Sequence, residues 1–156
     1  MVAQLYIILI MKDVQQNPRI LNEVCKKGNL EQYRQIVKEL FDFINKHGCR
    51  IATQYHRPTS TLDWSPPTGP IIRLNPEVHS EPLHVIWILL HEFGHFLSGK
   101  PQTPHLNNQQ RWERELLAWE HADQQLNKFP VLLPYMESYI HQRANCLKTY
   151  EDNLGI

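Results

Sequence analysis

The sequence predicts an α+β fold in which a short twisted sheet accompanies a central buried helix and a following helix that carries a glutamate. The run from Leu83 to Leu97 is apolar nearly all the way round a helix, which is typical of a buried central helix. Residues 29–47 place apolar side chains at helical spacing, and residues 49–55 and 71–74 are predicted strands. The length of 156 residues favours a single domain, residues 1–156.

Local signals along the chain define the other elements of the first half. The segment from Leu5 to Ile10 is rich in Ile and Leu and is expected to form a buried strand. Residues 56–70 contain four prolines and are predicted to form a loop. The strand at residues 71–74 should end at Asn75-Pro76.

The second half is predicted to be helical. Ser80 is expected to cap the apolar helix, with Pro82 tolerated in its first turn. Gly99-Lys100-Pro101 should end that helix. Two further helices are predicted at residues 109–127 and 134–150.

Charge and cysteine content narrow the classes of function. Sixteen basic and sixteen acidic residues give a formal net charge of zero, so neither nucleic acid nor an anionic membrane is an expected partner. The three cysteines are widely spaced, which favours reduced thiols in a cytoplasmic protein. The apolar segment Met1 to Met11 is too short to span a bilayer and lacks the basic residues of a signal peptide; Met11 is an alternative start.

The sequence His91-Glu92-Phe93-Gly94-His95 is an H-E-x-x-H motif inside the apolar helix. Residues four apart lie on one face of a helix, so both imidazoles can bind one metal ion. Glu92 is offset around the helix, where it can reach a water on that metal. Burial of three such polar groups costs several kcal/mol unless something satisfies them, and a metal does so. This pattern predicts a zinc site with Glu92 as general base.

A tetrahedral catalytic zinc uses three protein ligands, so a third is needed. The candidates are Glu113, Glu115, Glu120 and His105. A helix turns by about 100° per residue, which places Glu115 in the middle of an apolar stripe while Glu113 and Glu120 project from the other side. The stripe consists of Trp112, Trp119, Ala122 and Leu126.

A carboxylate on a face that points to the core needs a strong partner. Zinc is one such partner for Glu115, and an arginine such as Arg73 or Arg111 is another. Each ligand histidine should also have a hydrogen-bond acceptor that orients it, for which Asp123 is a candidate.

With these residues, the chain resembles the gluzincins, the zinc peptidases whose third ligand is a glutamate on a helix. The gap of 20 residues from His95 to Glu115 matches that of thermolysin-like enzymes, which are much larger and carry an aspartate at the position of Trp119. The ImmA/IrrE family is closer in size. Its pattern is a strand ending in Asn-Pro, an H-E-x-G-H helix and a helix reading E-x-x-A-N-x-F-A.

The resemblance to the ImmA/IrrE family covers roughly residues 71–126. The matching residues are Asn75, Pro76, His91, Glu92, Gly94, His95, Glu115, Ala118 and Ala122. Trp119 and His121 replace the usual Asn and Phe. The resemblance implies a zincin-like domain, a Zn2+ cofactor and the activity of a small cytoplasmic peptidase, in some members directed at a transcriptional repressor.

Together these features predict a zinc-dependent endopeptidase with His91, His95 and Glu115 as metal ligands. Its expected partner is a protein or peptide substrate bound in extended form. The resemblance to zincins implies that residues 71–74 form an edge strand of the sheet, with which such a substrate could pair. One alternative is a SprT-like protease with His105 as third ligand. The other is a binding or regulatory module that keeps the zinc scaffold without catalysis.

Overall fold

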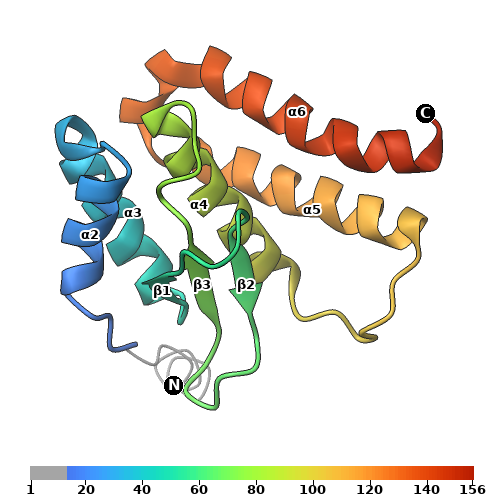
Figure 1. The fold of residues 1–156 in the computed structure, drawn as a ribbon, viewed down its shortest axis with the longest axis horizontal. Coiled ribbons are helices and arrows are strands. Elements are labelled where there is room, and N and C mark those ends of the chain that lie inside the picture. The colour runs from blue at the N-terminus through green and yellow to red at the C-terminus, as the bar shows by residue number, and fades with distance from the viewer. Residues whose placement is uncertain (1–13) are drawn as a thin grey trace, which may run out of the picture. The chain divides into compact units, whose positions relative to one another are not determined.

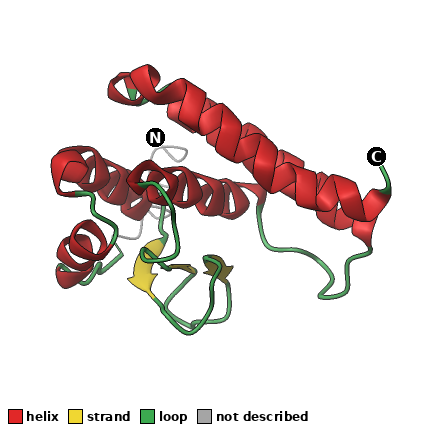
Figure 2. Ribbon diagram, turned by 45° about the horizontal axis from the view of Figure 1, so that its top comes forward, coloured by secondary structure: helices red, strands yellow, loops and turns green. Residues whose placement is uncertain are grey.

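The computed structural model describes residues 14–156 and has the expected α+β class, with helices and a small mixed sheet (Figures 1 and 2). The strand predicted at Leu5 to Ile10 lies outside the described residues. Two compact units divide the chain, Met1–Val78 and His79–Ile156. Within the described part of the chain, no helix has both the length and the apolar character that a membrane crossing requires.

The helices of the first unit are α2 (Arg19–Lys27), the 3-10 turn η1 (Glu31–Tyr33) and α3 (Arg34–Lys46). Together, η1 and α3 correspond to the predicted amphipathic helix. Helix α2 was not predicted from the sequence. Both α-helices bury one apolar face, formed by Ile20, Val24, Cys25, Ile36, Val37, Leu40, Phe41 and Ile44.

The sheet of this unit has the strand order β1-β3-β2. Strand β3 (Ile71–Leu74) pairs in parallel with β1 (Arg50–Thr53) and antiparallel with β2 (Thr61–Asp63). The expectation that residues 71–74 form an edge strand is therefore wrong, because both sides of β3 are already hydrogen-bonded. The predicted loop at residues 56–70 also contains β2, which is too short to show an alternating pattern.

The second unit contains α4 (Pro82–Ser98), α5 (Asn108–Leu126), the 3-10 helix η2 (Pro130–Tyr135) and α6 (Met136–Leu154). Gly99 ends α4 with a φ of 83°, a conformation that glycine adopts at little cost. The predicted cap is wrong, because Glu81 is the N-cap residue of α4 and no side chain caps that end.

Aromatic rings join the three long helices of the second unit. Trp87 on α4 and Trp119 on α5 each pack edge-on against Tyr139 of α6, with ring centroids 5.4 and 5.8 Å apart. The three side chains are almost completely buried. Because aromatic burial dominates core energetics, this cluster holds α5 and α6 against α4 and so supports the side chains that α4 and α5 carry.

Candidate metal centre

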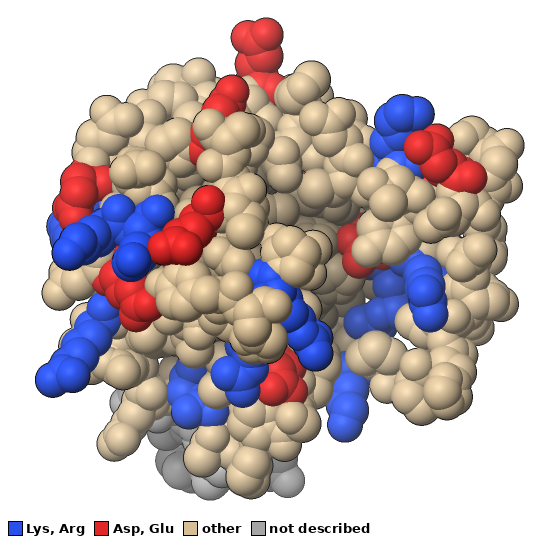
Figure 3. Space-filling view, in the orientation of Figure 1, with Lys and Arg blue, Asp and Glu red and all other residues tan. Residues whose placement is uncertain are grey.

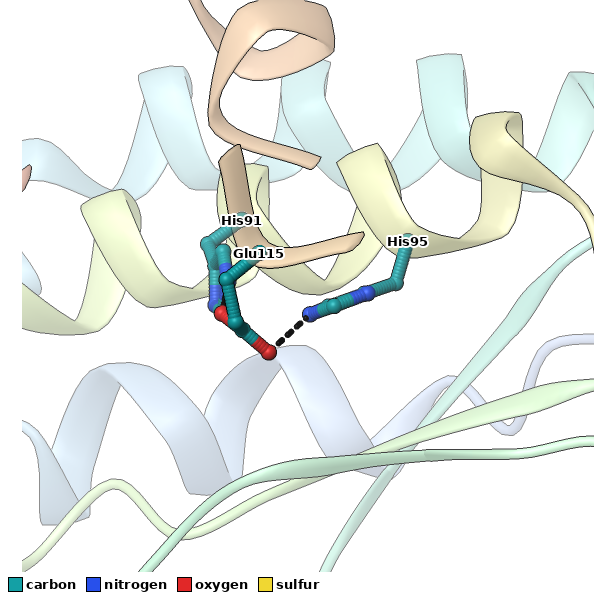
Figure 4. Close-up of side chains that lie close together, drawn as sticks. All are labelled: His91, His95 and Glu115. Atoms are coloured by element: carbon teal, nitrogen blue, oxygen red, sulfur yellow. Dashed lines mark hydrogen bonds and ion pairs between the residues drawn. The ribbon is translucent and has the colours of Figure 1, made fainter. Parts of the chain in front are cut away.

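Three donor side chains meet between α4 and α5 (Figure 4). His91 and His95 project from α4, and Glu115 reaches them from α5. Glu115 Oε2 lies 2.7 Å from His91 Nε2, and Glu115 Oε1 lies 3.0 Å from His95 Nε2. One donor atom from each residue falls within 4.8 Å of the other two. The structure thus brings together the three residues that the sequence predicted as ligands.

The helix periodicity of α4 explains how the two histidines meet. They are one turn apart, and their ring centroids are 4.6 Å from each other. The helix is apolar on most of its surface, so the motif lies in the interior. His91 is 8% exposed and Glu92 is 7% exposed. Polar groups buried to this degree need partners, which the cluster supplies.

Glu115 behaves as its position on the apolar stripe of α5 predicts. Its side chain is 12% exposed, whereas Glu113 and Glu120 are exposed. Neither arginine considered as its partner pairs with it. Arg73 forms an ion pair with Asp63 at 3.1 Å, and Arg111 Nε donates to the carbonyl oxygen of Leu106, also at 3.1 Å.

His105 is exposed in the segment between α4 and α5 and is not a member of the donor cluster found among residues 14–156. Asp123 is not the acceptor for a ligand histidine. Its carboxylate accepts hydrogen bonds from the Tyr139 hydroxyl at 2.6 Å and from Arg143 at 3.0 and 3.1 Å. The prediction for Asp123 is therefore wrong, and this residue instead links α5 to α6.

The electrostatics of the cluster follow from burial and proximity. Burial alone would raise the pKa of Glu115, but hydrogen bonds with His91 and His95 outweigh it and lower the pKa well below its usual range. Burial alone would lower the pKa of His95, but the hydrogen bond and charge of Glu115 raise it. The pKa of Glu92 is raised, mainly by burial. The group therefore retains an ionised carboxylate at Glu115 beside a less acidic one at Glu92.

The donor set fits a divalent metal ion. Two imidazole nitrogens and one carboxylate oxygen are ligands that zinc accepts, and bonds of about 2.0–2.1 Å in a tetrahedral site separate ligand atoms by about 3.3 Å. The 2.7 and 3.0 Å distances are slightly shorter, so the side chains need to open by only about half an ångström. Residues 91, 95 and 115 are thus a buried group that could hold a metal ion.

Trp119 also supports the site, a role that was not predicted from the sequence. Its indole ring stacks on the imidazole of His91, with centroids 4.5 Å apart and planes inclined by 17°. Because Trp119 is one turn beyond Glu115 on α5, the same helix face supplies both the carboxylate and the stacking ring. The i, i+4 spacing from Glu115 is the sequence signal that would have indicated this role.

Gly94 determines how closely α4 and α5 approach. A Cβ atom at this position would lie 2.0 Å from the carbonyl oxygen of Ala118 and 2.8 Å from its carbonyl carbon. The neighbouring atoms belong to backbone, so they cannot move without shifting the whole helix. Only glycine therefore allows α5 to approach closely enough for Glu115 to reach both histidines.

We expect Gly94→Ala to lower the free energy of unfolding by about 1–3 kcal/mol, the typical cost of overpacking. Helix propensity alone would give the opposite sign, a gain of about 1 kcal/mol. Zinc affinity should fall as well, because displacement of α5 moves Glu115. Urea unfolding of the metal-free protein and zinc titration against a chelator measure the two effects.

A double variant provides the control for this prediction. Ala118→Gly should not restore stability to Gly94→Ala, because the clash involves the backbone oxygen of Ala118 and not its methyl group. A stabilised Gly94→Ala protein with unchanged zinc affinity would contradict the close approach of the helices.

Comparison of the chain with protein-family models, with curated proteins and with solved structures found no match. The geometry of the cluster therefore carries the functional argument.

Proposed function

We propose that this chain is a zinc-dependent endopeptidase in which His91, His95 and Glu115 hold the metal and Glu92 is the general base. The observation that supports this proposal is the buried cluster of two imidazoles and one carboxylate, with a second buried carboxylate adjacent in sequence. A purely structural ion pair would not require the additional carboxylate, whose burial costs free energy. Buried carboxylates with shifted pKa values are typical of functional sites, because catalysis requires such shifts.

When bound, zinc would supply Lewis acidity, which acidifies a water molecule and polarises a substrate carbonyl. The chain's own groups have separate tasks. His91 and His95 must be neutral to donate their lone pairs, while Glu115 contributes its ionised carboxylate. Glu92 accepts a proton from the attacking water and passes it to the leaving amine. The raised pKa of Glu92 suits this role, because a base with a pKa closer to neutral can both take and return a proton.

We further propose that the substrate is a protein or peptide segment in extended form and that the enzyme acts in the cytoplasm without nucleic acid. Basic and acidic side chains are interspersed on the face shown in Figure 3, in keeping with the zero net charge. Neither feature favours the counterion release that drives binding to nucleic acid. Cleavage should occur in flexible linkers, because a folded segment cannot adopt an extended form. Strand β3 is not available for backbone pairing, so another surface must hold the segment.

The experiment that tests this proposal combines metal analysis with peptide hydrolysis. Purified protein should contain about one zinc per chain, the number that one site of this kind holds. It should cleave unfolded proteins until a chelator removes the metal, and added zinc should restore the activity. Stoichiometric zinc without any cleavage across a broad panel of unfolded proteins would instead favour a non-catalytic zinc module. Absence of metal binding would refute the proposal.

A further inference from the structure

Helix α6 runs antiparallel to α5 in the second unit (Figure 1), and polar contacts fix their register. Asp123 on α5 accepts hydrogen bonds from Tyr139 and Arg143, which are one turn apart on α6. Asp123 therefore lies opposite the α6 turn between these two residues.

This register places Tyr150 opposite Glu115. Glu115 precedes Asp123 by eight residues, which is about 12 Å along α5 at 1.5 Å per residue. Tyr150 follows the turn between Tyr139 and Arg143 by about nine residues, or about 13 Å along α6. Because the helices run in opposite directions, both distances are measured the same way along the helix pair. Glu115 and Tyr150 therefore lie at about the same level along their axes. The stripe Tyr139, Arg143, Tyr150 also keeps to one face of α6.

The Tyr150 side chain interacts with Glu115 as the register requires. Burial raises the pKa of the Tyr150 phenol, and the charge of Glu115 and a hydrogen bond with its side chain raise it further. The phenol hydroxyl is a hydrogen-bond donor. Tyr150 is far from the motif in the sequence, so the sequence alone did not indicate that it lies near the site.

A bound metal would change the hydrogen bonding of Glu115 and leave one of its oxygens free to accept a hydrogen bond from Tyr150. Each oxygen of Glu115 faces one imidazole. Imidazole nitrogens that bind a metal can no longer donate to the carboxylate. One oxygen of Glu115 would then bind the metal, and the other would lose its partner in a buried environment. A buried acceptor without a donor is destabilising.

We propose that Tyr150 is a positioning residue, whose hydroxyl donates to the Glu115 carboxylate and holds it in the orientation that binds the metal. This inference rests on the proposed function, because it assigns Tyr150 a role toward the same zinc site. Hydrogen-bond partners of ligands typically affect metal affinity by about 10- to 100-fold.

The test is Tyr150→Phe, which keeps the ring and removes only the hydroxyl. Its matched control is Tyr139→Phe, which removes the other α6 hydroxyl that faces a carboxylate of α5. Zinc affinity is measured by competition with a chromophoric chelator, and the visible spectrum of the cobalt-substituted protein reports ligand geometry. Circular dichroism first establishes that each variant is folded.

We expect Tyr150→Phe to weaken zinc binding by about 10- to 100-fold and to shift the cobalt bands. Tyr139→Phe should lower thermal stability while leaving zinc affinity and the cobalt spectrum as in the wild type. Wild-type affinity in Tyr150→Phe would overturn the inference, as would equal weakening in both variants, since that would indicate a general loosening of α6. If the wild type itself bound no metal, the proposed function would fail first, and the two failures are thus distinguishable.

Discussion

Glu115→Ala is expected to produce the largest loss of zinc affinity among single substitutions on α5. The change removes one of three donors and leaves two buried imidazoles without the carboxylate that pairs with both. The loss should exceed the roughly 10- to 100-fold that follows removal of a ligand's hydrogen-bond partner. Zinc titration against a chelator measures the affinity, and metal analysis after gel filtration measures retention.

Two glutamates on the same helix provide matched controls for Glu115→Ala. Glu113→Ala and Glu120→Ala should leave zinc affinity unchanged, because both side chains are exposed and belong to neither the cluster nor the apolar stripe. Surface substitutions of this kind usually change stability by about 0.5 kcal/mol or less. If His105→Ala released the metal and Glu115→Ala did not, the SprT-like alternative would replace the gluzincin one.

Glu92→Gln is expected to remove almost all peptide hydrolysis while zinc binding persists. General acid–base catalysis typically contributes about 10²–10⁴-fold, so kcat/KM should fall by that amount. The amide has the shape of the carboxylate and cannot accept the proton. The fold should not lose stability, because burial already disfavours the ionised form of Glu92. Initial rates on an unfolded protein substrate, with zinc content measured on the same samples, test both halves of the prediction.

Glu120→Gln is the control, because it makes the same change from carboxylate to amide at an exposed position outside the site. This variant should retain full activity. Loss of zinc in Glu92→Gln would mean that Glu92 is a ligand and not the base. Full hydrolysis with zinc retained would remove Glu92 from the mechanism.

The features that the sequence alone determined are those that depend on local geometry. A spacing of four residues is enough to place His91 and His95 on one face of any helix. A turn of 100° per residue similarly separates Glu115 from Glu113 and Glu120. The limits of β3 and the end of α4 at Gly99 were also predictable, because neighbouring residues decide where such elements stop.

Other features of the fold depend on pairing between distant segments. The pattern of residues 71–74 indicates a strand but not its neighbours, and only the pairing with β1 and β2 makes β3 central. Strand β2 has three residues, too few for an alternating pattern. Which strands pair with one another depends on segments that are distant in the sequence, so the residues of one strand do not specify its neighbours.

The same distinction applies to the candidate site. Periodicity shows that Glu115 faces inward, but the contact with both histidines also requires the close approach of α4 and α5 at Gly94. Likewise, the stacking of Trp119 on His91, the pairing of Asp123 with α6 and the position of Tyr150 depend on helix packing. The sequence thus determined which side chains could serve as donors, and the tertiary structure decided which groups surround them, because helix periodicity specifies a direction but not what lies there.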